Sequence, residues 1–333
     1  MDVLLVKLSS LGDVVQTMPV VHDLLQQFPG AHLDWVVEEA FAALVQRVQG
    51  LRTVIPMAER RWRNSGSAPA TRHERSLFEA QLQSQTYDVV IDFQGLIKSA
   101  LVARLAKLKV GGFRATYANK SEACGYEWPV RFMVNKAVPM PRRIHAVARY
   151  RALAAGVLAY TMVGLPIYGL KQPGVQEWQA AASHTVVFAH GTTRPDNEWP
   201  LAHWIELGHQ LIAQGFQIAL PQANAAENLL CEAIAQTLGP EACTVWPRMP
   251  LAQLLDAMAA CCGVVGVDSG LSHMAVALNL PHVQIFSQDR AWRAGPVGQA
   301  HQVAVGGASA PEVATVWQAW CTVQKAAPPQ AKP

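Results

Sequence analysis

A group of residues near the start of the chain has the side chains that acid–base chemistry needs. They follow a continuous apolar run at residues 3–6, and they are Lys7, Ser9, Ser10, Gly12 and Asp13. Such a run predicts a strand buried on both faces of a parallel sheet, and open α/β sheets bind ligands at the carboxyl ends of their strands. Asp13 could therefore take a proton from a bound hydroxyl group. Alternatively, it is only a helix-start acid favoured by the helix dipole.

The glycine spacing of this turn excludes two common phosphate-binding motifs. A P-loop has the pattern G-x-x-x-x-G-K-[ST], and a dinucleotide-binding turn has G-x-G-x-x-G. The turn at 7–13 has one glycine, Gly12, which we expect to permit a tight bend. Asp13 is therefore not expected merely to flank a phosphate-binding loop.

A second group of residues, at 267–273, repeats the order of strand end, glycine turn and helix start. Its members include Asp268, Ser269, Gly270 and His273. The unpaired N–H groups and the dipole of a helix start can bind phosphate or pyrophosphate. Alternatively, Asp268 or Ser269 is a plain helix N-cap, and His273 only packs.

Two further segments of the second half could contact the same ligand. Thr192, Thr193 and Arg194 lie in a loop after a strand predicted at 185–189, and their hydroxyls and guanidinium could face an anion. Glu227 follows a strand predicted at 217–220 and could accept hydrogen bonds from a ribose. The alternative for Glu227 is a solvated acid at a helix start.

The first half contains a cluster of arginines: Arg60, Arg61, Arg63, Arg72 and Arg75. The planar guanidinium suits carboxylate and phosphate groups, so the cluster predicts a substrate with more than one anionic group. A solvated loop is one alternative. A nucleic-acid site is another, but the interleaved aromatic residues and motifs of such proteins are missing apart from Trp62, and we expect no nucleic-acid partner.

The composition is that of a globular protein with large cores. Of the 333 residues, 51% are hydrophobic and 15% are charged, which excludes a disordered or fibrous chain. Residues 1–151 carry 20 Lys and Arg against 13 Asp and Glu, a net charge of +7, whereas the remainder carries 7 against 11, or −4. The first half should therefore prefer an anionic partner.

The cysteine pattern and the start of the chain indicate a cytoplasmic protein. The six cysteines form no C-x-x-C pair and no metal-spaced cluster, so we expect reduced thiols. The first strand begins at residue 3 without a basic segment or cleavage site, so we expect no signal peptide. Glycines and a proline interrupt the uncharged stretch at 152–170, which favours a helix end and a linker over a membrane span.

Strands and helices alternate along the chain, which predicts an α/β protein with two doubly wound domains. The expected domains are 1–160 and 185–305, with a linker at 161–184 and a helix with a disordered tail at 306–333.

Two stretches of the first domain are expected to have little regular structure. Within the first domain we expect a loop at 60–75, before a helix at 77–85, and a long basic connection at 114–143. Within the second domain we expect 283–286 to be the last strand.

Taken together, these motifs resemble the lipopolysaccharide heptosyltransferases of glycosyltransferase family 9, and type I more than type II. The resemblance covers nearly the whole chain and rests on residues 7–13, 34–39, 60–63, 92–99, 190–200 and 267–273. The segments Trp-Val-Val-Glu-Glu and Arg-Arg-Trp-Arg favour type I.

The resemblance implies a GT-B fold, in which two Rossmann-like domains face a central cleft. It also implies inverting, metal-independent and cofactor-free transfer of heptose from ADP-L-glycero-D-manno-heptose to Kdo of Kdo2-lipid A in the lipopolysaccharide inner core. The implied location is peripheral, at the cytoplasmic face of the anionic inner membrane. The sequence has no Asp-x-Asp pair to hold a metal on a diphosphate, so helix N-termini and basic side chains would stabilise the leaving group.

Carried over by position, Asp13 would be the general base. In the first domain, the acceptor would be bound by Lys7, Ser9, Ser10, Gly12, Arg60, Arg61 and Arg63. In the second domain, the donor ADP-heptose would be bound by Thr192, Thr193, Arg194, Glu227, Asp268, Ser269, Gly270 and His273.

Two positions depart from the family pattern. Asn197 stands where the family usually has a lysine, so a cation expected near the diphosphate is missing, and Arg194 or Arg293 is the candidate replacement. Ser287-Gln288-Asp289 replaces the usual Gly-x-Thr. The alternatives are therefore a type II enzyme, another GT-B sugar-nucleotide transferase, or a nucleotide-binding homologue with altered activity.

Overall fold

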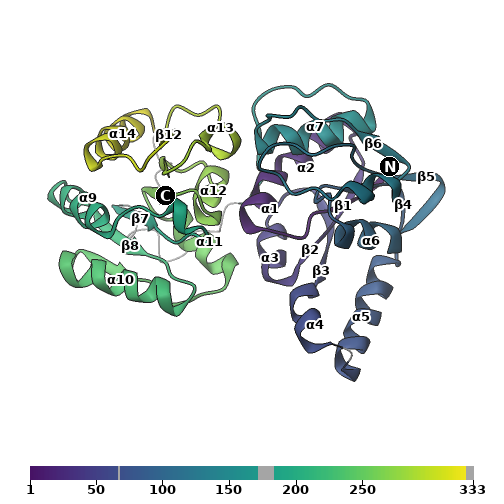
Figure 1. The fold of residues 1–333 in the computed structure, drawn as a ribbon, viewed down its shortest axis with the longest axis horizontal. Coiled ribbons are helices and arrows are strands. Elements are labelled where there is room, and N and C mark those ends of the chain that lie inside the picture. Colours follow the sequence, from purple (N-terminus) through teal and green to yellow (C-terminus); the bar gives the residue numbers. More distant parts are fainter. Residues whose placement is uncertain (67, 172–183, 328–333) are drawn as a thin grey trace. The chain divides into compact units, whose positions relative to one another are not determined.

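The computed structural model describes residues 1–66, 68–171 and 184–327. The chain divides into two compact units, Met1–Lys171 and Gln172–Pro333, and each contains a six-stranded sheet with helices on both faces (Figure 1). The predicted linker at 161–184 overlaps residues 172–183, which lie outside the described residues. The end of the predicted tail, 328–333, also lies outside them.

The sheet of the first unit is parallel throughout. Its strands are β1 (Asp2–Val6), β2 (His32–Glu38), β3 (Leu51–Met57), β4 (Thr86–Asp92), β5 (Lys107–Tyr117) and β6 (Lys136–Val138). Their order is β3-β2-β1-β4-β5-β6, so the chain leaves β1 and β4 in opposite directions. Val6 of β1 pairs with Asp92 of β4. A crevice is expected beyond this point, where the strand order reverses.

The helices of the first unit fill both faces of that sheet. They are α1 (Leu11–Thr17), α2 (Pro19–Gln27), α3 (Glu39–Val45), α4 (Glu59–Ser65), α5 (Pro69–Leu82), α6 (Ile97–Leu105), the short 3-10 helix η1 (Trp128–Phe132) and α7 (Ala146–Leu158). Helices α1, α2 and α7 pack together on one face, and α6 lies on the other (Figure 1).

The prediction of a loop at 60–75 is wrong, because α4 and α5 occupy this region. The arginine-rich composition conceals one buried aromatic residue in each helix: the rings of Trp62 and Phe78 pack edge to face, 5.7 Å apart. The indole N–H of Trp62 also donates to Glu74 Oε2 at 2.7 Å. The long connection expected at 114–143 likewise contains η1 and the three-residue strand β6, which is too short to show a pattern in sequence.

The last helix of the first unit, α7, is fixed to the start of the unit by a buried ion pair. Arg151 donates through Nε and Nη2 to the two carboxylate oxygens of Asp23 on α2, at 2.7 and 2.9 Å. The segment that follows α7 returns to the unit, where Leu170 forms an isolated bridge with Val48. The uncharged stretch at 152–170 is therefore the end of α7 and a non-helical segment. Among the described helices, none is both long and apolar enough to cross a membrane.

The sheet of the second unit is also parallel. Its strands are β7 (Thr185–Ala189), β8 (Gln217–Leu220), β9 (Cys243–Val245), β10 (Gly263–Val267), β11 (His282–Phe286) and β12 (Gln302–Gly306). They lie in the order β12-β11-β10-β7-β8-β9, so the order reverses beside β7 and β10. The expectation that residues 283–286 form the last strand is wrong. Edge strand β12 has no apolar run to reveal it in sequence, because only its first residue is buried.

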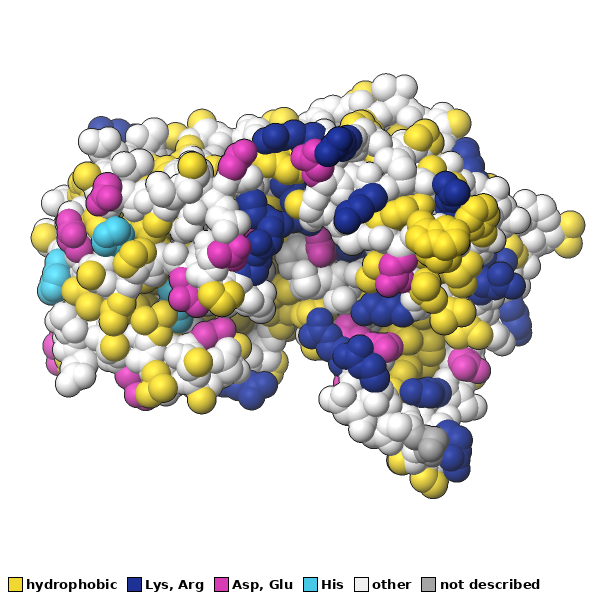
Figure 2. Space-filling model, viewed as in Figure 1, with side chains coloured by type: hydrophobic (Ala, Val, Ile, Leu, Met, Phe, Trp, Pro, Cys, Tyr) yellow, Lys and Arg dark blue, Asp and Glu magenta, His cyan; other side chains and the backbone are white. Residues whose placement is uncertain are grey.

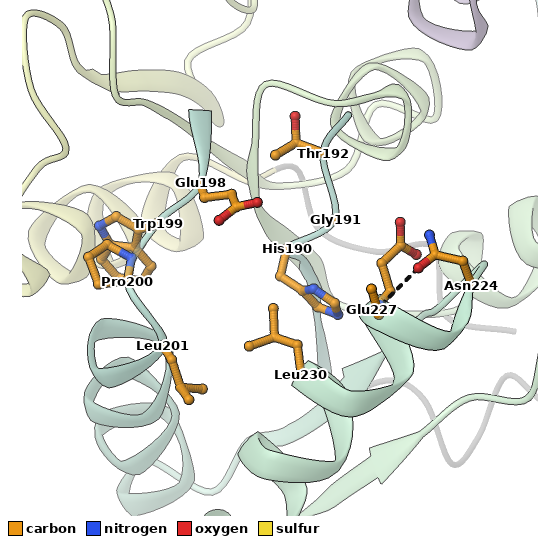
Figure 3. A pocket seen from close by; sticks show the side chains of 11 residues that line it. His190, Gly191, Thr192, Glu198, Trp199, Pro200, Leu201, Asn224, Glu227 and Leu230 are labelled. Atoms are coloured by element: carbon orange, nitrogen blue, oxygen red, sulfur yellow. Dashed lines mark hydrogen bonds between the residues drawn. The ribbon is translucent and has the colours of Figure 1, made fainter. Parts of the chain in front are cut away.

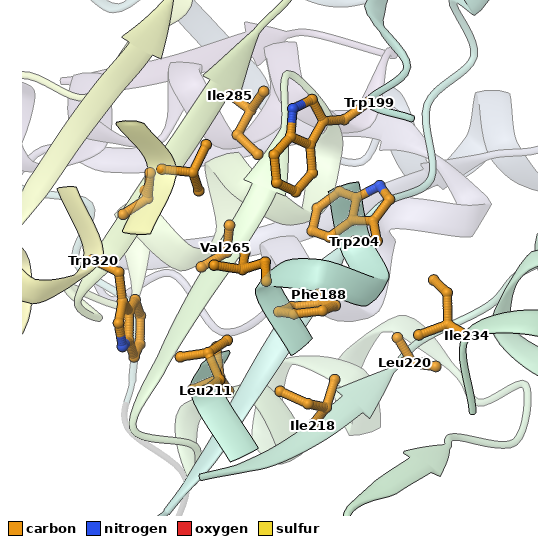
Figure 4. Close-up of a cluster of buried hydrophobic side chains, with 14 of the residues drawn as sticks. Phe188, Trp199, Trp204, Leu211, Ile218, Leu220, Ile234, Val265, Ile285 and Trp320 are labelled. Carbon is orange, nitrogen blue, oxygen red and sulfur yellow. The ribbon is translucent and has the colours of Figure 1, made fainter. Parts of the chain in front are cut away.

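Helices cover both faces of the second sheet and enclose an aromatic core. They are η2 (Pro195–Asn197), α9 (Leu201–Ala213), α10 (Ala225–Leu238), α11 (Leu251–Ala259), α12 (Gly270–Ala277), α13 (Ala291–Ala294) and α14 (Val313–Ala326). Trp204 of α9 is fully buried, and its ring centroid lies 4.9 Å from those of both Phe188 and Trp199 (Figure 4). Trp199 in turn donates its N–H to Pro311 O, so this cluster ties the loop before α9 to the core.

We expect Trp204→Ala to lower the free energy of unfolding by about 3–5 kcal/mol, because it leaves a large cavity among buried rings. Leu229→Ala, on the exposed side of α10, is the matched control and should change it by less than about 0.5 kcal/mol. Urea unfolding followed by circular dichroism measures both. A loss below about 1 kcal/mol for Trp204→Ala would show that the cluster collapses around the cavity.

Candidate active site

The carboxylate of Asp13 lies beside the reversal point of the first sheet and is held by three neighbours. Its Oδ1 accepts a hydrogen bond from the hydroxyl of Tyr150 at 2.8 Å. Its Oδ2 accepts from the backbone N–H of Ser10 at 3.4 Å and from the Ser10 hydroxyl at 3.2 Å. Lys7 Nζ lies 4.0 Å from the same oxygen. Asp13 is therefore an acid in the first turn of α1, as one alternative predicted, and it accepts the N–H of the N-cap residue Ser10. Its side chain is 24% exposed.

The amine of Lys7 is positioned by the same tyrosine. The Lys7 side chain is 4% exposed, and Nζ lies 4.9 Å from the centroid of the Tyr150 ring. The Lys7 carbonyl accepts a hydrogen bond from the indole of Trp35. Tyr150 thus contacts both the carboxylate and the ammonium group, which fixes their relative positions.

Asp92 holds the loop that follows β4 through hydrogen bonds to its backbone. Its carboxylate is fully buried and accepts hydrogen bonds from the backbone of Gln94 and Gly95 and from the Ser99 hydroxyl. Burial raises the pKa of Asp92 to about 6, against the lowering effect of these hydrogen bonds and of Lys7. The side chain of Gln94 then accepts the backbone N–H of Ser9. Asp92 is therefore a structural support for the turn at 7–13.

Gly12 does not make the tight bend that was expected. It lies inside the first turn of α1, which begins at Leu11, and it is not one of the glycines with a positive φ. The chain turns before the helix, at Ser9 and Ser10, where the loop is held by side chains.

The three arginines of α4 differ in their surroundings. Arg61 donates to both carboxylate oxygens of Glu39, at 3.1 and 3.0 Å, and to Glu74 at 2.6 Å. Its charge is therefore already balanced by two acids. Arg60 and Arg63 are exposed, and within the described ranges neither has an ion pair. Helix α4 thus offers Arg60 and Arg63, rather than all three of its arginines, for an anionic ligand.

The second unit contains a pocket of about 550 Å³ between the loop after β7 and the start of α10 (Figure 3). One side is apolar, with Leu201 and Leu230, and the other carries Glu227 and Asn224. Its lining consists of His190, Gly191, Thr192, Glu198, Trp199, Pro200, Leu201, Asn224, Ala226, Glu227 and Leu230.

Glu227 is fixed at the edge of this pocket by its backbone. Its N–H is capped by Asn224 Oδ1 at 3.0 Å, and its Oε2 accepts the N–H of Ala223 at 2.7 Å. A Cβ atom on Gly191 would lie 3.0 Å from the Glu227 carboxyl group, so glycine lets the loop pass close to the acid. Burial lowers the pKa of the adjacent His190, so this imidazole is neutral at physiological pH.

The turn after β10 combines a capped helix with a close contact between Asp268 and His273. Ser269 is the N-cap of α12 and accepts the N–H of Ser272 at 3.4 Å. Asp268 Oδ1 lies 3.3 Å from His273 Nε2 and also accepts from Gln284. The capping alternative for Ser269 therefore holds. The first backbone N–H groups of α12 nevertheless remain without helical acceptors, as at any helix start.

Asn197 joins two of the predicted donor segments. It is 1% exposed, and its Nδ2 donates to the carbonyl of Asp268 at 2.9 Å. The other segment that differs from the family pattern, residues 287–289, bonds to the same loop. Ser287 donates to Glu198 O, and Gln288 donates to Asp196. The two departures are thus in contact through one loop.

The structure argues against Arg194 as the replacement cation. Its guanidinium donates to both carboxylate oxygens of Asp196 through Nε and Nη2, at 3.3 and 3.1 Å. Thr192 and Glu227 line the pocket, whereas Thr193, Arg194 and the residues at 268–273 do not.

Similarity to known proteins extends over both units. The family model for glycosyltransferase family 9 (heptosyltransferase) matches residues 75–316. Lipopolysaccharide heptosyltransferase 1 of Pseudomonas aeruginosa is 36% identical over 90% of this chain and 82% of its own length. The protein of that name from Escherichia coli K12 is 37% identical over 86% of this chain and 88% of its own.

Solved structures agree with these relatives. E. coli heptosyltransferase WaaC with ADP gives a TM-score of 0.83 at 33% identity, covering 96% of this chain and 98% of that chain. The same enzyme with ADP-2-deoxy-2-fluoro heptose gives a TM-score of 0.79 over the same coverage. The fold and these matches define a glycosyltransferase with two Rossmann-like domains, the GT-B class. The chain belongs to glycosyltransferase family 9, the heptosyltransferases.

We expect the buried carboxyl group of Asp92 to make stability depend on pH. Its pKa is about 6 in the folded protein and about 4 in an unfolded chain, so the folded state binds the proton more tightly. The contribution to stability is present below about pH 4 and is lost as the pH rises through about 6. Between about pH 4 and pH 6, the free energy of unfolding of the wild type should therefore fall by about 2–3 kcal/mol relative to that of Asp92→Asn. Urea unfolding across this range tests it, and parallel pH profiles would contradict it.

Proposed function

We propose that the protein transfers L-glycero-D-manno-heptose from ADP-heptose to a Kdo sugar of Kdo2-lipid A, with inversion and without a metal ion. The names of the relatives at 36–37% identity support transfer of heptose to lipopolysaccharide and favour type I over type II. The observation that carries the chemistry is the partly exposed Asp13 carboxylate, held by Tyr150 at the reversal point of the first sheet. The identity of the acceptor in this proposal rests on the family resemblance.

In the proposed reaction Asp13 accepts the proton of an acceptor hydroxyl group. The hydroxyl oxygen forms a bond to the anomeric carbon of heptose while the bond from that carbon to the ADP phosphate oxygen breaks. The electron pair leaves with ADP, and a single displacement inverts the anomeric centre. Because Tyr150 and Ser10 hold both carboxylate oxygens, the base is oriented before substrate arrives, which lowers the entropic cost of the step.

The pocket of the second unit supports an ADP site. Its apolar side, with Leu201 and Leu230, suits an adenine ring, while the carboxylate of Glu227 suits ribose hydroxyls. In this proposal the diphosphate is bound by the start of α12, at Ser269 and Gly270. Thr192, Thr193 and Arg194 belong to the facing loop, and the Asp268–His273 pair supports the turn.

The acceptor would be bound by the first unit. Lys7 and Ser10 lie beside Asp13, and Ser9 and Gly12 shape the same turn. Arg60 and Arg63 are the α4 arginines best placed to bind anionic groups, because Arg61 is already paired. A lipid-linked acceptor places the enzyme at the cytoplasmic face of the inner membrane, as a peripheral protein.

We expect Asp13→Asn to lower turnover by about 10²–10⁴-fold, the usual contribution of a general base. ADP affinity should stay within about twofold, because the change affects chemistry rather than binding. Acceptor-dependent ADP release and calorimetric titration with ADP measure the two effects. Asp88→Asn is the matched control, because Asp88 lies near the amino end of β4, away from the sheet edge that carries Asp13. It should turn over as the wild type does. Equal losses of turnover and ADP affinity in Asp13→Asn would rule out the role of base.

We expect Glu227→Gln to weaken ADP binding by about tenfold to a hundredfold, because it removes charge-assisted hydrogen bonds to the ribose. Glu232→Gln, on the exposed side of the same helix, should bind ADP as the wild type does. Calorimetry with ADP and with free pyrophosphate distinguishes the ribose contact from the phosphate contact. Unchanged ADP affinity in Glu227→Gln would move the nucleoside out of this pocket.

Asn197 favours a second candidate, a nucleotide-binding homologue with altered activity. The side chain at this position, a lysine in the family pattern, is here an amide that bonds to Asp268 O. A wild-type protein that binds ADP but releases none from ADP-heptose in the presence of acceptor would support this candidate over the transferase.

A further inference from the structure

Large apolar side chains are exposed together where α6 meets η1 in the first unit. Trp128 and Phe132 of η1 are 66% and 67% exposed, and Leu101 of α6 is 53% exposed. Ile97 and Leu105 of α6 are also exposed, and the two elements contact each other. Figure 2 shows hydrophobic side chains gathered over this region, on the right of the view, with basic side chains near them. We call these five residues the α6–η1 surface.

The exposed stripe of α6 follows from its helical period. At about 100° per residue, Ile97, Leu101 and Leu105 lie within an arc of about 80°. The opposite side of the helix, with Ser99, Ala100, Val102 and Ala103, is buried against the sheet. The helix therefore has one apolar face in the core and a second one in solvent. An exposed apolar stripe of this kind marks an interaction surface.

The aromatic part of the surface is preformed. The rings of Trp128 and Phe132 pack edge to face with centroids 6.0 Å apart, and the buried Val130 between them anchors η1. The Glu127 carboxylate accepts the backbone N–H of Ile97 at 2.6 Å, which ties η1 to the start of α6. Little conformational entropy remains to be lost when these rings are covered.

Basic side chains flank the apolar residues. The guanidinium of Arg131 lies 4.6 Å from the centroid of the Phe132 ring. The exposed Arg104 and the half-buried Lys98 lie next to the apolar stripe of α6 on the helix circumference. Glu127, whose carboxylate accepts the backbone N–H of Ile97, contributes one negative charge against these three cations. The surface is therefore positive as well as apolar, within a first half of net charge +7.

We propose that the α6–η1 surface docks the protein on an anionic lipid bilayer. Aromatic rings settle at the headgroup level, aliphatic side chains enter the acyl boundary, and Lys and Arg attract the anionic headgroups. A second copy of this chain fits less well, because a two-fold contact through the same surface would bring its basic residues together. The proposal deepens the proposed function, since it rests on a membrane-held acceptor and names the surface that reaches it.

Co-sedimentation with vesicles tests the proposal without donor or acceptor. The probes are phosphatidylcholine vesicles with and without phosphatidylglycerol. We expect wild type to bind the anionic vesicles, and the double variant Trp128→Ser/Phe132→Ser to bind at least about tenfold more weakly. Arg104→Gln and Arg131→Gln should each weaken binding about fivefold, with a smaller salt dependence. Val110→Ser and Leu229→Ser change exposed apolar residues elsewhere and should bind as wild type does.

Several outcomes would overturn the proposal. The first is that the wild-type protein binds neither kind of vesicle. The second is that the double variant binds anionic vesicles as tightly as the wild type while circular dichroism shows that it is folded. A wild-type dimer in sedimentation that the double variant abolishes would assign the surface to self-association instead. Vesicle binding without heptose transfer would count only against the proposed function. Transfer to Kdo2-lipid A with no vesicle binding would count only against the surface.

Discussion

Both sites depend on one topological constraint, the parallel direction of the paired strands in each sheet. Parallel pairing places the carboxyl end of every strand on the same edge, so residues from distant parts of the sequence meet there. In the first unit this brings Lys7, after β1, beside Asp92 at the end of β4. In the second it brings the loop after β7 beside the turn after β10, where Asn197 bonds to Asp268. The order reversal then turns the flanking connections away from each other.

The sequence was sufficient where burial leaves a simple pattern. Continuous apolar runs located β1 and β10 with their polar ends, because strands covered on both faces need apolar residues throughout. The same reasoning placed Asp13 and the turn at 268–273 correctly at helix starts. It failed at α4 and at the part of α5 that precedes the helix predicted at 77–85, because one buried aromatic residue per helix is outweighed in composition by charged and polar residues. It also missed β12, whose edge position exposes much of the strand.

The rest of the candidate site could not be predicted, because it depends on contacts between distant residues. Tyr150 lies 137 positions from Asp13, and nothing in its local sequence marks it as a partner of that carboxylate. Arg61 resembles its neighbours in sequence, yet Glu39 and Glu74 neutralise it. Asn197 is a departure from the family pattern in sequence, whereas the structure shows it joining two loops. Charge alone did not reveal which groups were already paired.

Helix α7 determines how this protein could be divided. It is the last helix of the first unit, yet two of its residues bond to the start of the chain. Tyr150 donates to the Asp13 carboxylate, and Arg151 donates to the carboxylate of Asp23. The segment after it closes back on Val48 through Leu170. A fragment cut before α7 would lose the Tyr150 hydroxyl that donates to the Asp13 carboxylate. A chimera that exchanges the first unit should therefore take residues 1–171 as one module, with its boundary after Lys171.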